Sequence, residues 1–184
     1  MMRQLRGFLP WITYSAAAAL VDWRFAVVGA FAIAVAALVA SRRTASTDMF
    51  TVAAVVFFAG LTVVAVAAPA TGLHRYVGAL TPATLAVAAL VSIAIGQPFT
   101  IPFAKRVAPV ELWGTPAFLH INVVLSAVWA TSFAAMAAAI AAVLALQPQA
   151  VEIIIAAQVL GFVIPMRISR WYPAAVRARA LAAS

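Results

Sequence analysis

The stretch MFTVAAVVFFAGLTVVAVAA, residues 49–68, holds twenty residues, and none of them is charged. A helix that crosses the hydrocarbon core of a bilayer needs about 20 mostly apolar residues. Apolar side chains occupy every side of this stretch, so it lacks the one-sided pattern of a half-buried helix in a soluble protein. The stretch therefore predicts a transmembrane helix.

The rest of the chain has the same character. Its 184 residues are 67% hydrophobic and 9% charged, whereas soluble domains carry roughly 25% charged residues. We predict an all-α, polytopic transmembrane helical bundle of about six spans, formed by a single domain over residues 1–168 and followed by a basic cytoplasmic tail over residues 169–184. Besides residues 49–68, the predicted spans are residues 7–21, 24–40, 80–96, 116–146 and 150–166.

Residues 7–21 allow a second interpretation. Arg3 and Arg6 precede a short apolar run, as they do in a cleavable signal peptide. Trp11 is unusual in the apolar core of such a peptide, which favours a membrane span. Only two residues separate this segment from the next one. The pair therefore forms either a tight helical hairpin or one helix that is broken near Asp22.

The basic residues set the orientation of the chain. With six spans and the N-terminus inside, ten basic residues fall on the inner side and two fall on the outer side. This bias agrees with the positive-inside rule, so we expect both termini in the cytoplasm. The inner ten are Arg3, Arg6, Arg42, Arg43, Lys105, Arg106, Arg167, Arg170, Arg177 and Arg179, and the outer two are Arg24 and Arg75.

The stretch IAIGQPFTIPFAKRVAPVELWGTP, residues 93–116, contains four of the ten prolines and the only lysine. The residue before a proline is disfavoured in helical geometry, so short turns are expected here, joining two spans at the inner face. Lys105 and Arg106 suit anionic headgroups and, with Glu111 and Trp113, form a candidate surface for a membrane partner or lipid. The alternative, a re-entrant pore segment, requires costly burial of the two cations.

The predicted span 116–146 carries a polar face. Asn122, Ser126 and Trp129 share one side of the helix with three apolar residues, Phe133, Met136 and Ile140. Two interpretations are open: a helix–helix contact, in which polar side chains bond across the interface, and the lining of a pocket. The helix contact is favoured. His120 lies at the predicted inner end of the same span and completes the candidate polar residues.

No catalytic, cofactor-binding or metal-binding residue is assigned. The chain has no cysteine, and its four carboxylates lie in four separate regions. The predicted topology places His74 and His120 on opposite sides of the membrane, where they cannot hold one haem between them. The net charge of +8 is explained by basic residues that flank membrane spans, so nucleic acid is not an expected partner.

Several short motifs resemble a known family. They are GFLPWITYSAAAALVDW at the start, VVFFAGLTVV in the third span and LTPATLAVAALVSIAIGQP in the fourth, followed by a basic loop that leads to tryptophan, then asparagine and tryptophan. Over roughly residues 7–140 the chain resembles the bacterial intracellular septation protein A family. The resemblance implies a multi-pass protein of the bacterial cytoplasmic (inner) membrane that maintains the cell envelope through other membrane proteins. It implies neither enzymatic activity nor a cofactor.

Three hypotheses about function therefore stand side by side. The first is a non-enzymatic envelope protein that acts through membrane partners. The second is a small oligomeric transporter or channel for a small solute, which would use the polar face of residues 116–146; alanine-rich spans permit the self-association that it needs. The third is a membrane enzyme that acts on lipid or quinone, which would need His120, Glu111 and Lys105 to converge.

Overall fold

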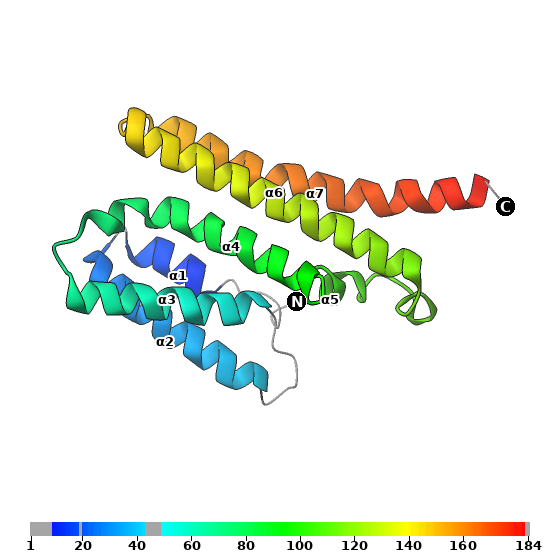
Figure 1. Cartoon of the computed structure of the whole chain (residues 1–184), viewed down its shortest axis with the longest axis horizontal. Coiled ribbons are helices and arrows are strands. Elements are labelled where there is room, and N and C mark those ends of the chain that lie inside the picture. Colours follow the sequence, from blue (N-terminus) through cyan, green and yellow to red (C-terminus); the bar gives the residue numbers. More distant parts are fainter. Residues whose placement is uncertain (1–8, 19, 43–48, 183–184) are drawn as a thin grey trace. The chain divides into compact units, whose positions relative to one another are not determined.

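The computed structural model describes residues 9–18, 20–42 and 49–182 (Figure 1). The described residues form helices and no strand, which confirms the all-α prediction. Five of these helices are long and apolar enough to cross a membrane. The elements are α1 (Leu9–Ala17), α2 (Trp23–Arg42), α3 (Met49–Ala67), η2 (Gly72–Tyr76), α4 (Val77–Ala94), α5 (Ile101–Ala104), η3 (Val110–Leu112), α6 (Pro116–Leu146) and α7 (Val151–Ala182).

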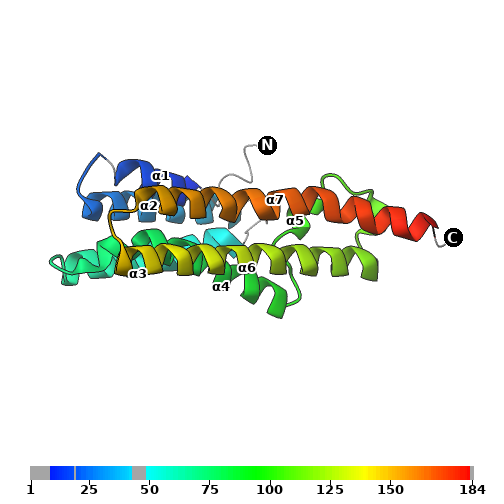
Figure 2. The same ribbon diagram turned by 90° about the horizontal axis from the view of Figure 1, so that it is seen from above.

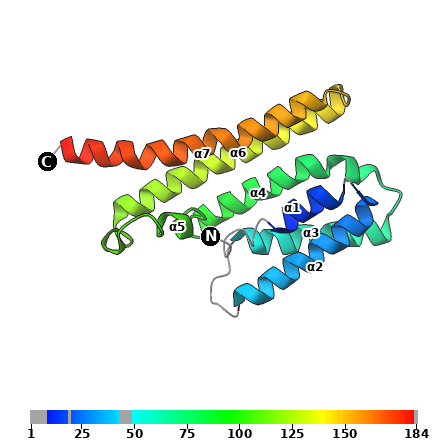
Figure 3. The same ribbon diagram turned by 180° about the vertical axis from the view of Figure 1, so that it is seen from behind.

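The chain divides into two compact units, residues 1–77 and residues 78–184. In the first unit, α2 packs against both α1 and α3, and α2 and α3 run in opposite directions (Figure 3). The buried side of α2 carries Ala26, Ala30 and Ala34, which are at most 2% exposed. Small side chains at intervals of four residues lie on one face of a helix and let neighbouring helices approach closely.

Aromatic rings fix α1 to α3. The Trp11 ring centroid lies 5.0 Å from those of both Phe57 and Phe58, and the Tyr14 ring lies 5.7 Å from that of Phe58. Such ring pairs add stability beyond their buried area. The indole N–H of Trp11 is buried and has no hydrogen-bond partner among the described residues. Helix α1 is therefore a packed part of this unit.

The predicted first span, residues 7–21, corresponds to α1. Residues 7, 8 and 19 lie outside the described residues, and the helix that is described there has nine residues. Nine residues rise about 14 Å, which is less than the ~30 Å hydrocarbon core. Helices α1 and α2 are separate and pack on each other, which confirms the helical hairpin of the two sequence-based alternatives.

In the second unit, α6 and α7 form an antiparallel pair joined by a short turn at residues 147–150 (Figure 2). The two helices have 31 and 32 residues, which corresponds to about 46–48 Å of rise. Because they start from the same turn, both exceed the ~30 Å core at the end away from that turn. The polar face of α6 begins at this end.

Helix α7 is continuous across a boundary that the sequence suggested. The predicted span 150–166 and most of the predicted tail 169–184 belong to one helix that ends at Ala182. Pro165 and Pro173 lie inside it. An internal proline removes one backbone hydrogen bond, and membrane helices tolerate this where neighbouring groups satisfy the freed carbonyl. The cytoplasmic location of the tail stays a prediction.

Between α4 and α6 runs a connecting loop, defined here as residues 95–115. It contains the short helices α5 and η3 among turns, as the clustered prolines predict. Thr115, which precedes Pro116, is extended with φ −79° and ψ 145°. Ile101 is an exception to the expectation for residues before proline, since it is the first residue of α5. Pro102 falls in the first turn of that helix. Backbone N–H groups there have no partner within the helix, so a proline costs no helical hydrogen bond.

Candidate functional site

The polar face of α6 holds the connecting loop through Thr100. The side chains of Asn122 and Ser126 are fully buried, and Thr100 is 7% exposed. The Thr100 Oγ1 atom lies 2.9 Å from Asn122 Oδ1, 3.0 Å from the Asn122 carbonyl oxygen and 3.0 Å from Ser126 Oγ. Asn122 Nδ2 donates to the carbonyl of Phe118 at 2.8 Å. Every polar group of this cluster therefore has a partner, as buried polar groups require.

A second anchor holds the start of the loop to α4. The Ser92 hydroxyl donates to the Ala89 carbonyl at 2.6 Å and accepts from the backbone N–H of Phe99 at 3.1 Å. Helix α4 ends in a Schellman arrangement, in which the N–H groups of residues 96 and 97 bond to the carbonyls of residues 93 and 92. Gly96 supplies the positive φ of 71° that this turn needs.

The middle of the loop is folded on itself and exposed. The Trp113 indole N–H donates to the Ala108 carbonyl at 3.1 Å, and Lys105 Nζ lies 5.0 Å from the centroid of the Trp113 ring. Such a cation–ring contact adds to the order of the loop. Val107 and Val110 are 86% and 65% exposed. The remaining candidate loop residues, Arg106 and Glu111, are also exposed.

The middle of α6 contacts α7. Trp129 Nε1 donates to Ser169 Oγ at 3.0 Å, and the Ser132 hydroxyl donates to the carbonyl of Gly161 at 2.9 Å. The Trp129 ring also lies 6.1 Å from that of Phe162, in an edge-on arrangement. Of the predicted polar face, Trp129 makes a helix–helix contact with α7, whereas Asn122 and Ser126 bond to the connecting loop through Thr100.

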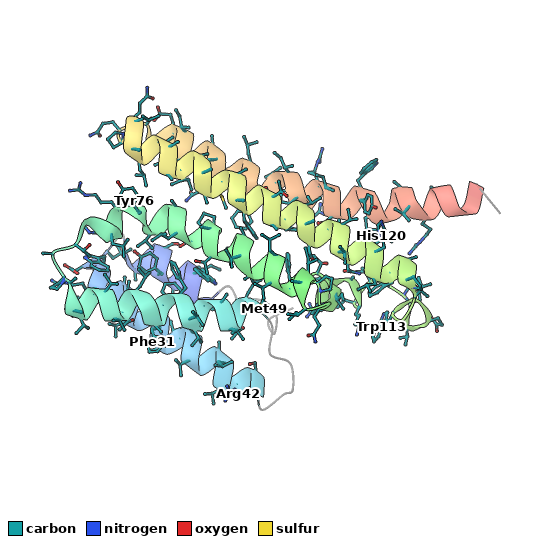
Figure 4. All side chains as sticks on the ribbon, in the orientation of Figure 1. Phe31, Arg42, Met49, Tyr76, Trp113 and His120 are labelled. Carbon is teal, nitrogen blue, oxygen red and sulfur yellow. The ribbon has the colours of Figure 1, made fainter. Side chains whose placement is uncertain are left out.

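The residues that a catalytic or metal site would need come from different elements of the structure. His120 lies exposed on α6, whereas Trp113 belongs to the connecting loop (Figure 4). Among the described residues, no group of three histidine, aspartate or glutamate side chains could hold a metal ion. Lys105 lies over the Trp113 ring. Glu111 forms no ion pair with any residue that the structure describes.

One further polar cluster lies in the first unit, at the turn between α1 and α2. Arg24 Nε lies 2.9 Å from Asp22 Oδ1, and the hydrogen bonds from Arg24 hold the pKa of this carboxyl below its usual value. The Trp23 ring stacks on the His74 ring, with centroids 5.7 Å apart. These contacts pair the two opposite charges and join the α1–α2 turn to η2.

Sequence reasoning missed Thr100 and Ser92, the two residues that position the loop. Ser92 lies within the predicted apolar span 80–96, and Thr100 lies among the prolines of residues 93–116. A hydroxyl flanked by two prolines, as in PFTIP, was the available signal for Thr100. Its partner Asn122 is 22 residues away in the sequence. The repeat of a helix relates only residues a few positions apart, so it does not predict this contact.

Comparisons with protein-family models, with curated proteins and with solved structures found no match to this chain. The resemblance to the septation protein A family therefore rests on the short motifs quoted above. Any assignment of function rests on the geometry of the connecting loop and the α6 polar face.

Proposed function

We propose that this chain is a non-enzymatic, multi-pass protein of the bacterial cytoplasmic membrane that supports the cell envelope by binding other membrane proteins. The connecting loop is its docking surface. The observation that carries this proposal is a loop that is anchored near its start to both α4 and α6 and is exposed in its middle. Ser92 and Thr100 anchor the loop, while Val107 is 86% exposed.

A loop that is ordered before it binds suits a docking role. Binding costs free energy when flexible side chains and loops become ordered, so a preorganised loop retains more of its contact energy. The Trp113 indole bond to the Ala108 carbonyl and the position of Lys105 over the indole ring provide this order. Two exposed valines then offer apolar contact area beside the cations.

The charges of the loop indicate the chemistry of the partner. Lys105 and Arg106 are exposed, and Glu111 is the one carboxylate in this stretch. The loop therefore favours a membrane protein that presents acidic side chains at the same membrane surface, since complementary charges steer association and set its specificity. The resemblance to septation proteins supports a partner in cell-envelope assembly.

Transport through the α6 polar face has less support. Asn122 Oδ1 and Ser126 Oγ both bond to Thr100, so their polar groups are occupied within the protein. A solute path along this face would require those bonds to break. Purified protein in liposomes is therefore expected to show no solute flux that depends on Asn122, and Asn122→Ala is expected to leave any basal leak unchanged.

The docking role is tested by a photo-crosslinking residue at Val107 in native membranes, with Gln149 as the matched control. Gln149 is also exposed but lies in the turn at the opposite end of α6. Discrete membrane-protein adducts are expected at Val107 and not at Gln149. The double variant Lys105→Gln and Arg106→Gln should weaken them, and the captured protein should bind the purified chain with the same dependence.

Two results would contradict the proposal. The first is crosslinking from Val107 to lipid alone, or to the same proteins as the control position. The second is substrate turnover or substrate-dependent flux by the purified protein, which would indicate an enzyme or a transporter.

A further inference from the structure

A single amide side chain lies exposed near the middle of the apolar part of α7. Gln158 follows Glu152 by six residues and precedes Arg167 by nine, which places it about 9 Å and 14 Å along the helix from these charges. All residues between the two charges other than Gln158 are apolar or glycine or proline. In a bilayer, Gln158 therefore lies within the hydrocarbon core.

The Gln158 carboxamide has no hydrogen-bond partner within its own unit, residues 78–182. A carboxamide has two N–H donors and one acceptor oxygen, and lipid tails supply no partner for any of them. Several hydroxyl side chains on the long helices avoid this cost by bonding to their own helix. The exposed Thr131 hydroxyl, for example, donates to the Ala127 carbonyl of its own helix at 2.9 Å. An exposed amide at this depth requires a partner from outside its own unit, residues 78–182.

Helix α7 also has the least internal cover of the long helices. In its most apolar window 11% of the residues are buried, against 22% to 44% in the other four candidate spans. Gly161 and Pro165 are the buried positions of its apolar part, and Gly161 lies against Met136 of α6. Ile155, three residues before Gln158, is 54% exposed and lies on the same side of the helix.

We propose that α7 is an interface between two copies of this chain, in which the Gln158 carboxamides bond to each other across the contact. A carboxamide is self-complementary, because each one offers a donor to the acceptor of the other. In a two-fold arrangement, the same surface of both copies meets itself, so two equivalent amides come together without any further polar residue. Polar side chains of this type hold membrane helices together.

This interface is separate from the docking loop, because no residue of residues 95–115 takes part in it. Self-association is measured on purified protein in liposomes, by single-molecule photobleaching of a dye on Gln149→Cys. The chain has no native cysteine, so this label is unique. Gln158→Leu is expected to weaken association by roughly five- to thirtyfold, and Gln158→Asn should retain most of it. Gln147→Leu, at the wetted end of α6, is the control and should have no effect.

The face of α7 is tested in the otherwise native protein by disulfide formation in membranes. Ile155→Cys should form crosslinked dimers, whereas Leu160→Cys should not, although Leu160 is 53% exposed. Leu160 lies two residues beyond Gln158, on roughly the opposite side of the helix. A monomer at all protein densities, equal association of Gln158→Leu, or equal crosslinking at both cysteines would overturn the proposal. So would a crosslink from Ile155→Cys to a different protein in place of a second copy.

Discussion

Replacing Thr100 by valine removes the hydroxyl that joins the connecting loop to α6 while keeping the shape of the side chain. Asn122 Oδ1 then loses a donor at 2.9 Å, and Ser126 Oγ loses a partner at 3.0 Å. Both side chains are fully buried, so water cannot replace the lost hydroxyl. The variant is expected to be less stable, with a loop that is no longer held at its first anchor on α6.

The size of the effect follows from the two orphaned groups. A buried acceptor without a donor costs about 1–3 kcal/mol, and this applies to Asn122 Oδ1. The Ser126 hydroxyl can turn to a carbonyl one turn back in its helix, so its loss is smaller. We expect Thr100→Val to lower the free energy of unfolding by about 2 kcal/mol.

The matched control is Thr131→Val on the same helix. The Thr131 hydroxyl is exposed and bonds to the carbonyl of its own helix, so this change should stay within about 0.5 kcal/mol. Combining Thr100→Val with Asn122→Leu replaces both partners by apolar groups, which should cost less than the sum of the single changes.

The free energy of unfolding is measured by reversible denaturant titration in mixed micelles. A spin label at Val107→Cys, the only thiol in the chain, reports the mobility of the loop in the same samples. The label should become more mobile in Thr100→Val and stay unchanged in Thr131→Val. The reasoning is refuted if the two valine variants are equally stable and the label moves alike in both.

Two further predictions concern a packing contact and an ion pair. A Cβ atom at Gly161 would lie 2.8 Å from Met136 Sδ and 3.2 Å from Met136 Cβ, so Gly161→Ala should lower the free energy of unfolding by about 1–3 kcal/mol. Gly60→Ala, with no atom within 4 Å, should raise it by about 0.5–1 kcal/mol; a destabilised Gly60 variant or a neutral Gly161 variant would contradict this. The lowered pKa of Asp22 means that its pairing stabilises the fold above the usual carboxyl pKa and that this contribution is lost as the pH falls through the folded value. An NMR titration should show the pKa of Asp22 rising in Arg24→Gln, and an unchanged value would show that Arg24 is not the cause.

The membrane-helical character of this protein follows from the sequence alone. The predicted span 49–68 became α3, Met49–Ala67, with an end that differs by one residue. In lipid, backbone groups must bond within the segment, so a long apolar stretch has helix as its available structure. It was also predictable that Asn122 and Ser126 lie on the same side of their helix, because side chains four residues apart in an α-helix share a face.

The tertiary structure decided what those side chains contact. Thr100 reaches Asn122 because the loop folds back across α6, and that closure depends on the Ser92 anchor and the turn at Gly96 rather than on any local period. It likewise decided that α7 continues through Pro165. A proline marks a lost hydrogen bond, but whether the helix ends there depends on the neighbouring groups that satisfy the freed carbonyl, which only the packed structure supplies.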